Sequence, residues 1–346
     1  MCAVLLCLAC KLELETISGT SVDYRYSPGL VPCAGNATYV DQFAVFAAGL
    51  LAVDRPAHVS FAWVPAEEFG VGRLRSCEGS LGCASKNEAY SQWPIHLHEV
   101  VHALLYSVNE APLPFLEEGV ATALDMSVYL TLDVLRVNSG GKDDGDPRPE
   151  LTKEAHIDYA KAGLFTLYLI QRYGPEKFMT LYRRSKRAAD LSAVRGLFLN
   201  VYDIELDEIV EAYLQDNDCP ADIIHFPWYE CTAPRLSPQD GAWLVERPVD
   251  CSEDDARGGI DSDLGVATSV TIEVTEPGSH TIEIVGPDIG MVHLAPCGGC
   301  RWLDRQVVVF TGDTETAFLP VGEYLVTARF FEASEADVRV SITPSP

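Results

Sequence analysis

The spacing of hydrophobic residues changes along this chain, and the change limits the folds available to it. At six places before residue 220 the apolar residues recur at helical spacing, over residues 41–53, 94–108, 114–129, 155–173, 175–186 and 204–216. After about residue 265 they alternate in short runs such as TSVTIEVT and HTIEIVG, separated by turn residues. Helical spacing favours packed helices, and alternation favours strands with one buried face. We therefore predict an α+β chain in which a mainly helical domain precedes an antiparallel β-sandwich.

The same patterns predict the domain organisation. We expect a short apolar leader over residues 1–10, a mainly helical domain over 11–220, a Pro-rich linker over 221–240 and the β-sandwich over 241–346. Within the helical domain, HVSFAWV alternates as a strand does, and ASKNEAYS is expected to be a short edge strand. The helical domain should therefore contain a small N-terminal sheet.

Charge narrows the set of partners. The chain has 25 basic and 51 acidic residues, a formal net charge of −26. An acidic surface repels phosphate backbones, so nucleic acid is not an expected partner.

The eleven cysteines point to an oxidising compartment. Three lie in the leader, and the even set that remains is typical of an exported protein with disulfides. Short separations favour local pairs, namely Cys77 with Cys83, Cys219 with Cys231 or Cys251, and Cys297 with Cys300. Two alternative interpretations of CGGC at 297–300 are half of a zinc knuckle and a redox-active pair. No second CxxC completes a four-cysteine zinc site.

The leader resembles a truncated export signal. AVLLCLA is a short apolar run with no positive residue before it. CLAC ending at Cys10 is similar to a bacterial lipobox, whose cysteine is lipidated after cleavage, although Cys7 stands where that pattern favours leucine. We expect an extracytoplasmic protein that is secreted, periplasmic or attached to the membrane through a lipidated Cys10.

The stretch IHLHEVVHALLYSV contains candidate metal-binding and catalytic residues. His98, Glu99 and His102 form an H-E-x-x-H pattern on a segment with helical spacing. Residues four apart lie on one helix face, so both imidazoles can bind one Zn²⁺, and Glu99 beside them can act as a general base. Unpaired histidines are costly to bury in an apolar helix, which favours a metal site over a metal-free helix.

A second helical segment supplies a third ligand. HEVVH followed by FLEEGVA resembles the gluzincin metallopeptidases, in which HExxH precedes a helix opening (W/F)-L-x-E-G-x-A. In that family the glutamate before the glycine is the third zinc ligand, and this position is Glu118 rather than Glu117. The resemblance implies a thermolysin-like catalytic domain in an exported bacterial zinc peptidase.

The resemblance extends downstream. YAKAGLFTLYLIQRYG is similar to a segment that forms a helix behind the site in these peptidases. Tyr159 at its start is a candidate oxyanion donor and equally a core or capping residue, and His156 is a weaker candidate for the same role. Asp125 is a candidate partner for a ligating histidine or a solvent-facing aspartate. His96 is interpreted as structural or substrate-proximal.

The expected activity is peptide-bond hydrolysis, with a peptide or protein substrate. The G-x-M-E-N motif of the aminopeptidase branch is absent from the sequence, so exopeptidase activity has no support. GEYLVTARF resembles a strand of the sandwich modules that follow catalytic domains in secreted peptidases. The alternative function is a non-catalytic surface lipoprotein that binds a partner through its β-sandwich and keeps a vestigial or structural metal site.

Overall fold

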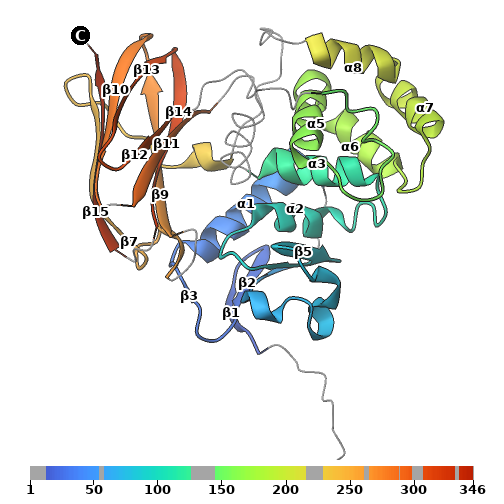
Figure 1. Ribbon diagram of the computed structural model, residues 1–346, viewed down its shortest axis with the longest axis horizontal. Helices are drawn as coiled ribbons and strands as arrows, with labels where there is room; N and C mark the ends of the chain where they lie inside the picture. The colour runs from blue at the N-terminus through green and yellow to red at the C-terminus, as the bar shows by residue number, and fades with distance from the viewer. Residues whose placement is uncertain are drawn as a thin grey trace, which may run out of the picture.

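The chain is a mixed α+β protein. The computed structural model describes residues 13–53, 58–125, 145–215, 229–260, 265–287, 289–297, 307–331 and 335–345. Figure 1 shows helices around one sheet on one side and two facing sheets on the other. The predicted α+β architecture with sandwich-like sheets is thereby confirmed. The leader with Cys10, and also Cys219 and Cys300, lie outside the described residues.

A five-stranded sheet lies in the N-terminal part. Its order is β1 (Glu15–Ser18), β2 (Val22–Tyr26), β4 (Val59–Trp63), β6 (Glu88–Ser91) and β5 (Gly82–Ser85). β2, β4 and β6 are parallel, whereas β1 and β5 are antiparallel to their neighbours. The predicted single edge strand ASKNEAYS is wrong. Lys86 adopts a positive φ of 57° and turns the chain, so this stretch joins two strands and β5 forms the edge.

Helices pack on this sheet and on one another around a single core. They are α1 (Asn36–Leu50), α2 (Leu97–Leu105), α3 (Pro114–Leu124), α5 (Tyr159–Tyr173), α6 (Pro175–Arg184), α7 (Leu191–Tyr202) and α8 (Leu206–Gln215). α1 and α2 contact the sheet, and α3 lies between α2 and α5. The apolar spacing did not predict α7, whose buried face has only Val194, Phe198 and Tyr202.

The opposite face of the sheet has a smaller core. Leu74 from the 3-10 helix η2 (Gly72–Cys77) packs there with Ala62 and Tyr90. The predicted disulfide between Cys77 and Cys83 is present and joins η2 to β5.

The β-sandwich has two antiparallel sheets. One contains β13 (Thr314–Leu319), β10 (Gly278–Val285), β15 (Glu335–Pro344) and β7 (Trp243–Asp250) in that order. The other contains β12 (Val307–Phe310), β11 (Gly290–Pro296), β14 (Gly322–Phe330), β9 (Val266–Val274), β8 (Arg257–Ile260) and β3 (Val31–Pro32). Side chains from both sheets form a second core between them, as expected for a sandwich.

Segments far apart in the sequence join the two parts. β3 comes from the N-terminal region but pairs with β8 at the edge of the six-stranded sheet. The buried Asn36 side chain follows it, donating to the carbonyl of Gly258 at 2.6 Å and accepting from the Gly258 N–H at 2.9 Å. The boundary predicted near residue 220 therefore misses one strand of the sandwich.

Disulfides reinforce this junction and correct the local pairings expected from spacing. Cys251 pairs with Cys33, and Cys231 pairs with Cys297. The expected pairs of Cys219 with Cys231 or Cys251, and of Cys297 with Cys300, are therefore wrong. A disulfide needs Cα atoms about 4.4–6.8 Å apart, and folding meets that condition between cysteines distant in sequence.

The disulfides also bear on location. Three of them are present among the described residues, which indicates an extracytoplasmic protein, because reducing compartments keep thiols free. No helix in the described parts of the chain is long and apolar enough to span a bilayer.

Candidate metal centre

Helix α2 holds the two histidines of the H-E-x-x-H pattern. One face of α2, including Leu97, Val101 and Leu104, is buried in the core and fixes the helix. The backbone N–H of His98, in the first turn, donates to the buried carboxylate of Asp125 at 3.0 Å. A carboxylate at a helix N-terminus satisfies an otherwise unpaired donor and offsets the helix dipole. Asp125 thus lies beside a ligand candidate, and the recorded bond is with the backbone.

Helix α3 brings Glu118 to the two imidazoles. Its Oε2 lies 3.0 Å from Nε2 of His98 and 3.3 Å from Nε2 of His102, and the two Nε2 atoms are 3.0 Å apart. Tetrahedral zinc with bonds of about 2.0–2.1 Å has ligand atoms about 3.3 Å apart. The three atoms therefore form one face of a tetrahedron of suitable size, and this group can hold a metal ion.

Close contact between α3 and α5 sets this position. Gly119 follows Glu118, and a Cβ there would meet the Thr166 hydroxyl and the Ala162 carbonyl of α5. A side chain at residue 119 would push α3 away from α5. The glycine of the FLEEGVA motif is therefore a packing requirement.

Glu117 takes no part in the cluster. Its carboxylate pairs with Arg187 at 2.9 Å. The two adjacent glutamates thus point to different partners, and only Glu118 lies beside the histidines.

The ligand candidates balance one another's charge. Burial disfavours the charged form of His102, but its hydrogen bond with Glu118 and that carboxylate's negative charge raise the His102 pKa to about 9. Burial would raise the pKa of Glu118, but hydrogen bonds from His102 and His98 hold it well below the usual range. A proton on His102 therefore partly takes the place that a cation would fill.

Glu99 lies next to this group without joining it. Its side chain is buried, and burial raises its pKa while the neighbouring histidines lower it. A buried carboxylate near a metal-binding group is suited to accept and return a proton, because its basicity is increased.

His96 is a neighbour whose place the sequence did not specify. It is buried, with Nδ1 3.0 Å from the Ser91 hydroxyl and Nε2 4.0 Å from Oε1 of Glu99. Burial lowers its pKa to about 3. A Cβ at Gly82 of β5 would overlap both His96 and Glu99. The sheet edge therefore passes directly beside the site.

Tyr159 lies on the open side of the cluster. It starts α5, its ring centroid is 5.6 Å from that of His98, and it is 47% exposed. Partial burial and the charges of Glu118 and Glu99 raise its pKa to about 12, so it remains a hydrogen-bond donor at neutral pH. His156 is exposed, in left-handed backbone with φ of 57°.

Comparisons with known proteins do not assign a family. No family model matches the chain, and no curated protein matches it. A periplasmic inhibitor of g-type lysozyme from Aeromonas hydrophila matches 33% of the chain and 96% of its own length, with 11% identity and a TM-score of 0.25. A mannanase with a carbohydrate-binding module from Podospora anserina matches 31% of the chain and 28% of its own, with 13% identity and a TM-score of 0.20.

A third match is a carbohydrate-binding module of a Cellvibrio mixtus lichenase. It covers 32% of the chain and 92% of the module, with 15% identity and a TM-score of 0.19. Scores this low carry no functional argument, so a function can be inferred only from the site itself.

Proposed function

We propose that this protein is an extracytoplasmic zinc metallopeptidase of the gluzincin type, with a thermolysin-like catalytic domain. The observation that carries the proposal is the buried Glu99 beside a group of two histidines and one glutamate. His98, His102 and Glu118 would hold Zn²⁺, an ion that matches a His₂Glu donor set. Zinc bound there supplies a Lewis acid and lowers the pKa of water.

The side chains around this group have defined roles in peptide hydrolysis. Glu99 accepts the proton of the attacking water and transfers it to the leaving amine. Tyr159 donates a hydrogen bond to the oxygen that gains charge as the scissile carbonyl is attacked. His96, held by Ser91, packs beside the Glu99 carboxylate, with its Nε2 4.0 Å from Oε1.

The substrate would lie along the edge of the five-stranded sheet. β5 is the edge strand, and its Gly82 backbone approaches His96 and Glu99 closely. An extended peptide can add to such an edge through backbone hydrogen bonds, which places its carbonyl groups near Glu99. The proposed partner is therefore a peptide or protein, with no role for nucleic acid. Lipid attachment at Cys10 remains part of the proposal and lies outside the described residues.

Metal content and peptidase activity, measured together, test the proposal. Casein digestion and zinc content would be measured for the wild type, Glu99→Gln and Glu117→Gln. We expect Glu99→Gln to lose activity by about 100-fold or more while it retains zinc, because only proton transfer is removed. Glu117→Gln is the matched control, since the adjacent Glu117 pairs with Arg187, and it should keep both properties.

Each contrary result excludes a part of the proposal. Full activity in Glu99→Gln would eliminate the mechanism. Zinc without hydrolysis in the wild type would favour the alternative function, a surface lipoprotein with a vestigial or structural metal site. A structural zinc site has four protein ligands, and the described residues provide three here.

A further inference from the structure

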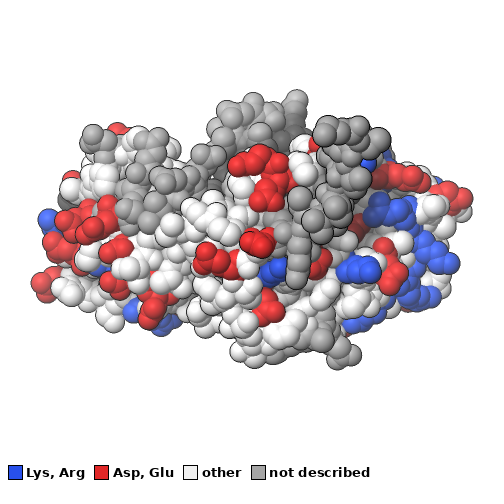
Figure 2. Space-filling model, turned by 90° about the horizontal axis from the view of Figure 1, so that it is seen from below, with Lys and Arg blue, Asp and Glu red and all other residues white. Residues whose placement is uncertain are grey.

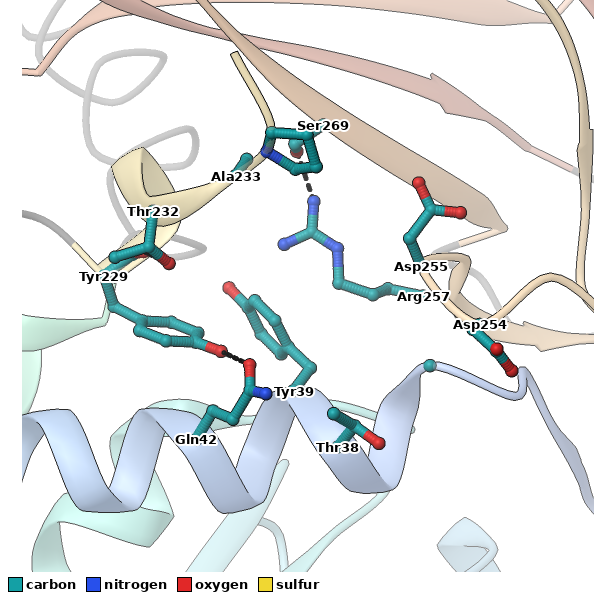
Figure 3. A pocket seen from close by; sticks show the side chains of 12 residues that line it. Thr38, Tyr39, Gln42, Tyr229, Thr232, Ala233, Asp254, Asp255, Arg257 and Ser269 are labelled. Atoms are coloured by element: carbon teal, nitrogen blue, oxygen red, sulfur yellow. Dashed lines mark hydrogen bonds between the residues drawn. The ribbon is translucent and has the colours of Figure 1, made fainter.

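A second candidate site lies where the helical part meets the β-sandwich. Figure 3 shows a pocket bounded by α1, by the short 3-10 helix η3 (Tyr229–Thr232) and by strands β8 and β9 of the six-stranded sheet. Its volume is about 170 Å³. An engineered protein cavity of about 150 Å³ holds one six-membered ring, so this pocket is of the size for a small molecule.

Arg257 projects into this pocket. Its guanidinium lies 4.5 Å from the centre of the Tyr39 ring and donates to the hydroxyl of Ser269. The carboxylate of Asp255 does not neutralise it, because that group is held by both guanidinium nitrogens of Arg247 at 2.7 Å. Among the described residues, no carboxylate lies within ion-pair distance of Arg257.

Arg329 places a second positive charge beside the first. In the six-stranded sheet, Arg257 and Arg329 both align with Ala267, one on each side, so they are neighbours across three strands. The Nε atom of Arg329 is buried without a hydrogen-bond partner. In the described structure this guanidinium has no recorded hydrogen bond or ion pair. Burial, together with the charge of Arg257, lowers the Arg329 pKa to about 10.

Two neighbouring arginines without a counter-ion in the described part of the chain are energetically unfavourable. A buried unpaired charge costs free energy, and like charges repel. The sequence has many acidic residues that could neutralise them, and acidic side chains are prominent over the sandwich end of the molecule in Figure 2. The other arginines of the sandwich region that the structure records in ion pairs, Arg235 and Arg247, do have carboxylate partners. Among the described residues, Arg257 and Arg329 thus have no carboxylate partner, and an anion bound in the pocket would supply one.

We propose that this pocket binds a small hydroxylated monocarboxylate, of the size and chemistry of one hexuronic acid unit. The carboxylate would pair with Arg257, and Arg329 behind it would add to the attraction. Gln42 Oε1 accepts from the Tyr229 hydroxyl and the Thr232 hydroxyl donates to the Tyr229 carbonyl. The Gln42 amide N–H groups and the Thr232 hydroxyl oxygen therefore remain as a donor and an acceptor for ligand hydroxyl groups. The carboxylate of Asp254, which also lines the pocket, can accept from a hydroxyl but repels a second negative charge, which disfavours phosphate esters.

The test is binding of defined sugars to the full-length protein. Thermal unfolding and calorimetric titration would use D-glucuronate and D-galacturonate, with D-glucose and D-galactose as neutral counterparts. A short peptide with a free C-terminal carboxylate, and its amide, would form a further arm. We expect the hexuronates to bind and to raise the melting temperature, and the neutral sugars and both peptides to have no comparable effect.

Variants separate a binding role from a structural one. Arg257→Lys and Arg329→Met should each weaken hexuronate binding about tenfold or more, because a charge-assisted hydrogen bond or a neighbouring charge is lost. Arg235→Met is the control, since Arg235 is an exposed arginine of the same region paired with Glu273 and Glu323, and it should bind normally. Without ligand, Arg329→Met should melt at a higher temperature than the wild type, because an uncompensated charge is removed.

Four results would overturn the proposal. They are no hexuronate binding by the wild type, equal binding of the neutral sugars, preferential binding of the peptide acid, and a lower melting temperature for ligand-free Arg329→Met. The last result would assign Arg329 a structural role. The metal centre contributes no residue to this pocket, so these outcomes are independent of peptidase activity.

Discussion

The candidate metal centre and the pocket that contains Arg257 differ in how their charges are compensated. At the metal centre, Glu118 lies within 3.3 Å of both imidazoles, and His102 and Glu118 stabilise each other's charged form. At the pocket, Arg257 lines the wall and Arg329 flanks the same Ala267 on the next strand, and neither has a described carboxylate partner. A protonated histidine can stand in for a metal ion, whereas an arginine cannot lose its charge near neutral pH. The charges of the first site are thus compensated by its own residues, whereas a bound anion would compensate those of the second.

The two sites also differ in how they are assembled. The three candidate ligands come from two successive helices within residues 98–118. The pocket combines side chains from α1, η3 and the sandwich, from Gly35 to Ser269. Its geometry depends on the junction between the two parts, whereas the metal centre depends on local helix packing. Substitutions at the junction and at the metal centre should therefore have separable effects.

The largest effect on stability should come from the disulfide at the junction. Replacing Cys33 and Cys251 by alanine opens a loop with a sequence separation of 218, and chain entropy then predicts a loss of about 5 kcal/mol in unfolding free energy. Replacing Cys77 and Cys83, with a separation of 6, should cost about 2 kcal/mol. Denaturant unfolding of the two double variants measures the difference. Equal losses would mean that the junction is no more dependent on its cross-link than the local loop.

The next largest expected effect is a loss of zinc affinity when Glu118 is replaced. Glu118→Gln should weaken zinc binding by more than about 100-fold, because changes outside the ligand shell already cost about 10–100-fold. Glu117→Gln should bind zinc normally. Competition with a chelator measures both affinities. Normal zinc affinity in Glu118→Gln would remove Glu118 from the ligand set.

Zinc affinity should also depend on pH. The His102 pKa is raised from the usual 6.5 to about 9, so its charge stabilises the metal-free protein fully below pH 6.5, and this stabilisation is lost as pH rises through 9. Zinc must displace that proton, so apparent affinity should rise about tenfold per pH unit from pH 7 to 9. Titrations across this range test the expectation. A plateau beginning near pH 6.5 would show that Glu118 does not hold a proton on His102.

The smallest expected effect is the loss of stability when the N-terminal cap of α5 is removed. The Asp158 side chain accepts from the backbone N–H of Lys161 and caps the helix that begins with Tyr159. Asp158→Ala should reduce the free energy of unfolding by about 1 kcal/mol. Asp190→Ala removes the equivalent cap of α7, with a similar expected cost, but lies on a helix that contributes no site residue. Only the first variant should change peptide turnover, by moving Tyr159.

Much of the secondary structure could be predicted because burial imposes a period on the sequence. β10 and β15 alternate as strands with one buried face do, and α2 carries a clear apolar stripe. α7 was missed because few of its residues are buried. β13, also missed, has an exposed pattern with one buried residue, Leu319, so alternation in the sequence is weak. A helix or strand with few buried side chains shows only weak periodicity of apolar residues in the sequence.

The sequence by itself determined that a mainly helical part precedes a β-sandwich, and it identified the candidate ligands of the metal centre. His98 and His102 are four residues apart on one helix and must share a face, and the FLEEGVA motif in the next helix indicated Glu118 as the third ligand. Tertiary structure alone decided the sandwich strand β3, two of the three disulfides among the described residues, the position of His96 and the arginine pair. These features join residues separated by many positions in the chain. Local periodicity describes which face a residue occupies, but contact between distant faces is fixed only when the whole chain packs.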